Sequence, residues 1–150
     1  MAVENIIRVY DRDMNKIAYL ENAYGVGYDL PLNELWTAHF TMPADDEKNR
    51  HCQVFNYVEI FDAQDRVELF RIMPSTLRRN EQGSITDQCE HVVATVLDDV
   101  MFQYHQIGNV GVGTIEVLRY ILDHQIEKRW QLGMCEFSRY FEYEWENENL

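Results

Sequence analysis

Glycine and proline are scarce in this chain of 150 residues, which has 7 glycines and 3 prolines. Their low number, together with an aromatic content of 13%, excludes a collagen-like or disordered chain. No apolar run approaches the roughly 18 residues that a membrane-spanning helix needs. Residues 1–4 also lack the basic and apolar regions of a signal peptide. We therefore expect a soluble globular protein without membrane insertion, large enough to bury a core without disulfides.

Positive charge is also scarce, since 13 lysines and arginines face 26 aspartates and glutamates, for a net charge of −13. Proteins that bind DNA by neutralising phosphates need clusters of basic residues, and the cluster at Arg78-Arg79 is short. This argues against specific nucleic-acid binding and against an anionic-membrane binder. An acidic surface can still line a conduit through which DNA slides, because like charges repel.

Cysteines are few, odd in number and far apart in the sequence, at Cys52, Cys89 and Cys135. They do not form a closed disulfide framework, so free and mostly buried thiols are expected. The pairs His51-Cys52 and Cys89-x-His91 suggest zinc, but a structural zinc site needs about four ligands at recurring short spacings. The sequence therefore predicts no metal and no cofactor.

One segment resembles the beginning of a calcium loop, because Asp11, Asp13 and Asn15 match the first three ligand positions of an EF-hand. The sixth position is Lys16, where the sharp turn needs glycine, and the twelfth is Asn22 rather than glutamate. A polar hairpin turn is the better interpretation.

Motifs of known enzyme classes are absent as well. The glycine-bearing loop at residues 108–113 lacks the Gly-Lys-Ser/Thr of phosphate-binding loops. There is no Gly-x-Ser-x-Gly and no His-Glu-x-x-His, although a cysteine nucleophile with one of the five histidines stays compositionally open. We expect no catalytic residues, so the chain is not predicted to be an enzyme.

Alternating patterns dominate the first 90 residues. Residues 35–42 place Trp36, Ala38, Phe40 and Met42 on one face, which predicts a half-buried strand. Residues 54–61 are apolar on nearly both faces, as in a central strand. Further strands are expected at 6–10, 16–20, 66–72 and 85–89, with a helical turn at 43–48. Short strands separated by turns favour a small barrel or sandwich, of which we expect an antiparallel β-barrel.

Helical spacing replaces this alternation after residue 90. Apolar residues from Val92 to Met101 predict a short amphipathic helix. A longer helix is expected from Thr114, as its N-cap, to the basic residues 128–129, with Ile126 in its apolar stripe. Residues 135–145 alternate between aromatic and acidic side chains, which predicts a strand.

The expected fold class is therefore α+β, a small antiparallel β-barrel followed by a helix-containing segment with a C-terminal strand. We expect two domains, a β-barrel-like domain at residues 1–90 and an α+β segment at 91–150. The second reads as the truncated start of a further domain, and the chain as a fragment of a larger protein.

Aromatic residues supply the candidate interface. The aromatic face of the last strand, with Phe141, Tyr143 and Trp145, lacks a cover, and exposed apolar surface usually marks an interface. Trp36 is a further candidate for core or interface, as are Tyr24 and Tyr28, because large aromatic side chains are usually buried.

Several segments together resemble the N-terminal hub region of phage minor tail structural proteins, the tail-associated lysin or baseplate hub family of Gram-positive phages and prophages. The likeness covers nearly the whole chain in order. Its segments are residues 8–11, 16–23, 35–43, 56–62, 70–72, 89–91, 97–99 and 114–122.

The resemblance implies a homotrimeric baseplate hub at the virion tail tip, assembled in the host cytoplasm. Its trimer docks to the distal tail ring around the DNA channel, with the tape-measure protein as a further partner. It implies no catalytic residue in this region. Two other classes stay open. One is a fragment of a cysteine or carboxylate hydrolase that acts on the cell wall, which substitution of Cys89 and His91 would test, and the other is a small carbohydrate- or protein-binding module.

Overall fold

The computed structural model describes residues 6–62, 65–74, 83–107, 113–136 and 143–149. The chain divides into two compact units, Met1–Val92 and Val93–Leu150. The expected boundary between residues 90 and 91 lies beside this division, and whether each unit is an independent domain stays a prediction. No helix in the described part of the chain is long and apolar enough to cross a membrane.

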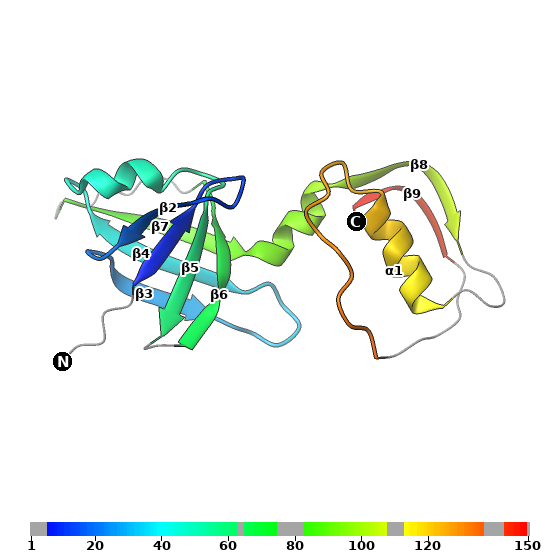
Figure 1. Ribbon diagram of the computed structural model, residues 1–150, viewed down its shortest axis with the longest axis horizontal. Helices are drawn as coiled ribbons and strands as arrows, with labels where there is room; N and C mark the ends of the chain where they lie inside the picture. The colour runs from blue at the N-terminus through cyan, green and yellow to red at the C-terminus, as the bar shows by residue number, and fades with distance from the viewer. Residues whose placement is uncertain (1–5, 63–64, 75–82, 108–112, 137–142, 150) are drawn as a thin grey trace. The chain divides into compact units, whose positions relative to one another are not determined.

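The first unit is built on one antiparallel sheet of seven strands in the order β2-β1-β5-β6-β7-β4-β3 (Figure 1). A short 3-10 helix, η1 (Glu47–His51), follows β4. The strands are β1 (Ile7–Tyr10), β2 (Lys16–Leu20), β3 (Tyr24–Asp29), β4 (Thr37–Pro43), β5 (Tyr57–Asp62), β6 (Asp65–Ile72) and β7 (Ser84–His91).

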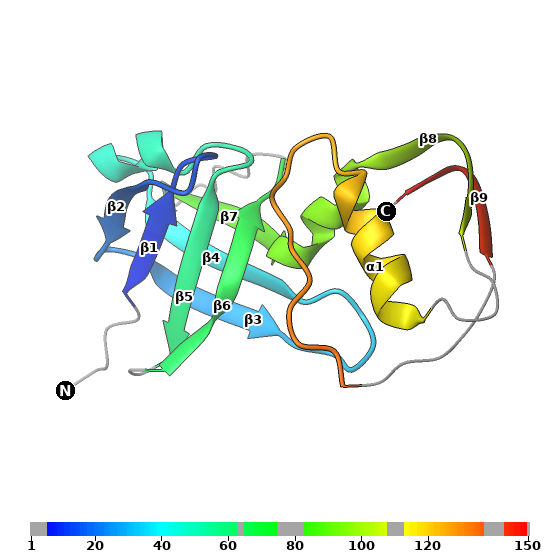
Figure 2. The same ribbon diagram turned by 45° about the vertical axis from the view of Figure 1, so that its right-hand side comes forward.

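The sheet curves so that its two halves face each other across the hydrophobic core. Figure 2 shows β1, β5 and β6 in front of β3, β4 and β7. Alternate residues of each strand point into the space between the halves, as the period of two requires. The fully buried side chains include Phe40 of β4, Ile60 of β5 and Phe70 of β6. The alternation expected for 35–42 is confirmed, because Ala38, Phe40 and Met42 are buried.

The expected closed barrel is wrong, although the α+β class is consistent with the structure. The sheet is open, because β2 and β3 are its outer strands and do not pair with each other. The β3 edge has an irregular register between Tyr24 and Gly27, where Gly25 adopts a left-handed φ of 57°. At the other edge, η1 contacts β2, and the Lys48 ammonium donates to the Tyr19 carbonyl at 2.7 Å. Because β3 is irregular and β2 is covered by η1, the two outer strands do not form the backbone hydrogen bonds that would close the barrel.

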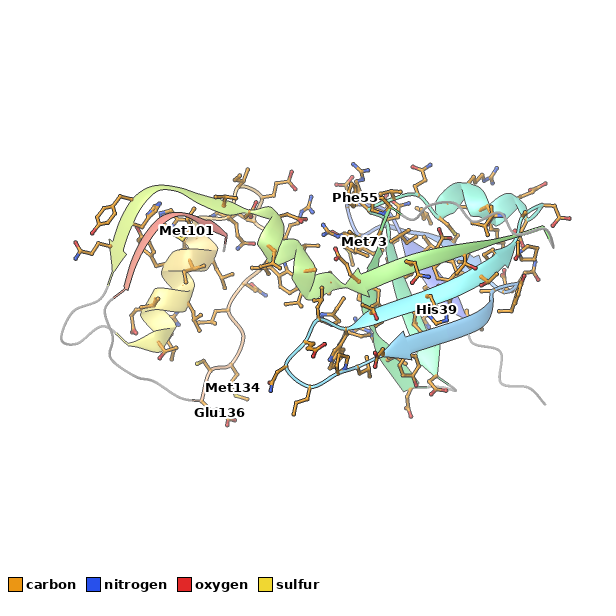
Figure 3. The ribbon with its side chains drawn as sticks, turned by 180° about the vertical axis from the view of Figure 1, so that it is seen from behind. His39, Phe55, Met73, Met101, Met134 and Glu136 are labelled. Atoms are coloured by element: carbon orange, nitrogen blue, oxygen red, sulfur yellow. The ribbon has the colours of Figure 1, made fainter. Side chains whose placement is uncertain are left out.

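Strand β3 itself was not expected, because its two glycines weaken a strand pattern. The structure shows why Gly27 fits there. A Cβ atom at Gly27 would lie 2.4 Å from Cε1 of His39, the β4 residue directly opposite, which is labelled in Figure 3. The imidazole therefore occupies the space that a side chain would need.

The hairpin expected at residues 6–20 is confirmed, since β1 and β2 pair in antiparallel register. In its turn, Oδ1 of Asp11 accepts hydrogen bonds from the backbone amides of Asp13 and Asn15, both at 2.9 Å. The Asn15 side chain donates to the other carboxylate oxygen at 3.1 Å. These bonds lower the pKa of Asp11, with those of Asn15 as the largest cause. The carboxylate thus organises a turn in which Met14 adopts a positive φ.

The second unit combines a strand pair with one helix. Its elements are the 3-10 helix η2 (Val92–Asp98), which begins one residue before the unit, β8 (Val100–Ile107), α1 (Thr114–Asp123) and β9 (Tyr143–Asn149). Strands β8 and β9 pair antiparallel, and α1 lies beside them (Figures 1 and 2). Met101, labelled in Figure 3, and Val117 are each 2% exposed, the lowest values among the apolar side chains described in this unit.

The helix expected from Val92 to Met101 is wrong in its second half. The 3-10 helix ends at Asp98, and Val100 and Met101 begin strand β8 instead. The sequence of β8 is rich in β-branched and aromatic residues, so its strand preference prevails over the apolar spacing that leads into it.

The second expected helix begins at the predicted place but is shorter. Gly113 rather than Thr114 is the N-cap, and the Glu116 carboxylate accepts a hydrogen bond from the Gly113 amide at 3.1 Å. The helix ends at Asp123, so Ile126 lies beyond it and is 68% exposed. The side chain of Gln125 explains the ending, because it donates to the Leu122 carbonyl at 2.6 Å.

The last strand lies later than expected. It spans Tyr143–Asn149, whereas Cys135 and Glu136 lie outside any strand. Residues 137–142 lie outside the described part of the chain, as do most of the loop at 108–113 and the basic pair at 78–79.

We expect Asp46→Ala to lower the free energy of unfolding of the first unit by about 1 kcal/mol, as is typical for the loss of an N-cap. Asp46 caps η1 by accepting from the Lys48 amide at 2.8 Å, and it also accepts from the Asn22 side chain at 2.8 Å. Urea unfolding followed by Trp36 fluorescence measures the change. Glu47→Ala, which removes an exposed neighbouring carboxylate, is the control and should change the stability little.

Candidate protein interface

Trp36 connects the β3–β4 loop to the sheet. Its indole N–H donates to the Pro31 carbonyl at 3.2 Å, and its ring meets the His91 ring edge-on at a centroid distance of 5.2 Å. The backbone amide of His91 also donates to the Trp36 carbonyl at 2.8 Å. The ring is half-buried against the core, so Trp36 fixes the conformation of the loop and leaves only part of its own surface exposed.

Exposed apolar side chains accumulate in β3 and in the loop that Trp36 fixes. We call this set the Tyr-Leu surface, and Leu32 is its most prominent member at 88% exposure. Such side chains in one short region, rather than scattered singly, are typical of binding surfaces. The members of the Tyr-Leu surface are Tyr24, Tyr28, Leu30, Leu32 and Leu35.

Tyr28 is held in place within this set by a hydrogen bond. Its hydroxyl donates to the Asp62 carboxylate at 2.6 Å, and this bond is the largest cause that raises the pKa of Tyr28. The acceptor belongs to β5, so the bond links the outer strand β3 to the other half of the sheet. The phenol ring is thus presented in one orientation.

The three leucines of this surface were not predicted as interface residues from the sequence. Leu30, Leu32 and Leu35 follow no helix or strand period, and Pro31 and Asn33 between them indicate a turn. The available signal was this aperiodic apolar cluster inside a turn-forming segment. Periodic patterns of apolar residues indicate buried faces, so they do not indicate these exposed leucines.

The aromatic candidates of the last strand are placed only in part. Phe141 lies outside the described residues. The backbones of Tyr143 and Trp145 belong to β9, where they pair with Ile107 and His105 of β8. Their role at an interface stays a prediction.

Two of the three thiols are poor nucleophiles. Cys89 is buried, and burial raises the pKa of its thiol well above the usual value. Burial likewise raises the pKa of Cys52 to about 12, and its thiol donates to the Lys48 carbonyl at 3.8 Å. Since the thiolate is the reactive form, both groups are unreactive at neutral pH.

Histidines and a tyrosine come together in the second unit. The hydroxyl of Tyr120 lies 2.8 Å from Nδ1 of His105, and the rings of His105 and His124 meet edge-on with centroids 4.7 Å apart. Nδ1 of His124 donates to the Tyr120 carbonyl at 2.7 Å, which fixes its tautomer. The cluster connects β8 to the end of α1. In the described residues no group of three or more histidine, cysteine or acidic side chains could hold a metal ion.

The second unit also has a polar pocket of about 210 Å³, whose lining includes Asp98, Asp99, Glu127 and Trp130. Gln125 shapes its wall, because its side chain accepts from the Trp130 amide and donates to the Trp130 carbonyl, both at 2.8 Å. The Trp130 indole donates to Thr95 at 2.9 Å. The hydrogen bonds of Gln125 and Trp130 therefore stabilise the loop that follows α1.

Comparisons with known proteins add no relative: no family model matches this sequence, and no curated protein matches it significantly.

Proposed function

We propose that this chain is a structural component of a phage tail tip, a baseplate hub protein that self-associates and docks to the distal tail ring around the DNA channel. The observation that carries the proposal is the Tyr-Leu surface, a group of exposed apolar side chains on strand β3 and on the loop that Trp36 fixes. Groups of this kind are typical of protein interfaces rather than of reaction centres.

The support for an assembly role is that the loop of the Tyr-Leu surface is held in one conformation. The loop that bears Leu30, Leu32 and Leu35 is fastened to the sheet by Trp36 and His91. A preorganised loop loses little conformational freedom on binding, so more of the contact energy contributes to affinity. The net charge of −13 suits a channel lining that DNA must pass without adhering.

The hydrolase alternative gains no support from the thiols. Its candidate nucleophile, Cys89, is buried and has a raised pKa, and burial also lowers the pKa of His91. An active cysteine needs the opposite conditions, an accessible thiol with a lowered pKa.

The proposal predicts that the purified chain forms trimers, and that Leu32→Asp weakens them. Burying a leucine contributes about 1.5–3 kcal/mol, so the association constant should fall at least tenfold. Light scattering over a range of concentrations measures both results. Coexpression with a distal tail ring protein then tests docking.

Ile126→Asp is the matched control, because Ile126 is also an exposed apolar residue but lies in the second unit. It should leave the oligomeric state unchanged. A chain that stays monomeric at millimolar concentration, or a trimer that tolerates Leu32→Asp, would contradict the proposal.

A further inference from the structure

A carboxyl group lies inside the core of the first unit. Asp87 of β7 is 7% exposed, and its partner in the β4–β7 ladder is Phe40, which is fully buried. Oδ2 of Asp87 is buried and has no hydrogen-bond partner in the described residues. A buried polar atom without a partner is costly and rare, and it calls for a physical explanation.

Among the described residues, the titratable groups that face Asp87 provide no positive charge. On its own strand, Cys89 shares the inward face with Asp87, and Cys52, at the end of η1, packs against the same core. After burial, the negative charge of Asp87 is the next cause that raises the pKa of both thiols. His91 lies farther along the same face, and burial lowers its pKa. From β4 the facing residue is Phe40, whereas the neighbouring His39 is on the exposed side.

Asp46, the N-cap of η1, is the remaining acid near these thiols, and its charge acts on Cys52. Its carboxylate is engaged by the Lys48 amide and the Asn22 side chain. Burial raises the pKa of Asp87 to about 6, and no cation of the described residues opposes this shift. The carboxyl group is therefore mostly neutral below this pH and mostly charged above it.

The segment that supplies Cys52 is attached mainly by polar contacts. The helix η1 contains no buried residue. Asn49 donates to the Pro43 carbonyl at 2.7 Å, Lys48 contacts Glu21 and the Tyr19 carbonyl, and Cys52 packs on the core. Segments with few buried apolar contacts are the first to open locally.

We propose that Asp87 makes the η1 segment a proton-controlled lid, which is closed over the neutral acid and opens when the carboxylate ionises. Opening admits water to the buried oxygen that has no partner in the closed state. The charged form gains most from this hydration, so ionisation shifts the equilibrium toward the open state.

The sign of the pH effect follows from linkage. The pKa of Asp87 is higher in the closed state than in an open, hydrated state, so the closed state binds more protons between the two values. Closing is therefore favoured in acid and disfavoured as the pH rises toward 6, after which the effect levels off. With an ordinary pKa near 3.9 in the open state, the opening equilibrium should rise about tenfold from pH 5 to pH 8.

Hydrogen exchange of the η1 amides on the whole chain tests this proposal, with rates corrected for their intrinsic pH dependence. In the wild type, protection of the amides of residues 47–52 should fall about tenfold between pH 5 and pH 8. In Asp87→Asn it should not change with pH, and the core amides of β5 should stay protected in both proteins. Retained protection in β5 separates opening of the lid from global unfolding.

Asp29→Asn is the matched control, because it makes the same change at an exposed strand position. It should keep the wild-type pH profile. Protection of η1 that is independent of pH in the wild type, or an unchanged profile in Asp87→Asn, would overturn the lid. Equal loss of protection in η1 and β5 would also overturn it, since the whole unit would then respond.

Discussion

Glu90→Ala should destabilise the first unit by about 1.5–3 kcal/mol, because it removes a charged hydrogen-bond acceptor from a buried guanidinium. Arg71 of β6 faces Glu90 of β7 in the ladder, and Nε of Arg71 donates to the Glu90 carboxylate at 3.0 Å. The arginine side chain is 9% exposed, and its Cζ lies 5.4 Å from the centroid of the Phe55 ring. Urea unfolding followed by Trp36 fluorescence measures the loss.

Glu59→Ala is the matched control for this result. Glu59 also lies on an inner strand, but its ion-pair partners Arg8 and Arg66 have side chains that are 41% and 52% exposed, and its further partner, the Tyr10 hydroxyl, is uncharged. Water can solvate these two arginines once the carboxylate is gone, so the loss should be about 1 kcal/mol. Equal effects of the two substitutions would show that burial of Arg71 does not determine the cost.

Phe40→Ala should lower the free energy of unfolding by about 3–5 kcal/mol. Phe40 is fully buried and lies in β4, which is paired on both sides, so the surrounding strands cannot collapse into the space. The same fluorescence measurement applies, because Trp36 is the tryptophan of the first unit.

Phe40→Leu is the companion variant, since it preserves apolar character and most of the volume. It should cost less than about 1.5 kcal/mol. If alanine cost no more than leucine at this position, the core around Phe40 would have to be able to repack, contrary to the fixed strand pairing.

Much of the first unit was predictable because its strands follow simple rules. The alternation of residues 35–42 is confirmed by the burial of Ala38, Phe40 and Met42, and the β1–β2 hairpin is confirmed by its register. Such patterns report burial on one face, which short-range sequence encodes. They carry no information on whether the outer strands meet, so the open sheet was not foreseen.

The remaining elements depend on contacts between distant residues. Strand β3 contains two glycines, and Gly27 makes sense only beside the imidazole of His39. The end of α1 depends on Gln125, whose side chain reaches both the helix and Trp130. The exposed leucines of the Tyr-Leu surface follow neither a helix nor a strand period, so hydrophobic periodicity does not identify them.

The protected outer strands of the sheet have a consequence for assembly. Copies of the chain at high concentration could pair edge to edge without limit if both outer strands were bare, yet β2 is contacted by η1 and β3 has an irregular register. Pairing of outer strands between copies, which depends little on sequence, is thereby disfavoured. Contacts through side chains of the loops can be altered by substitution while the folded sheet stays the same.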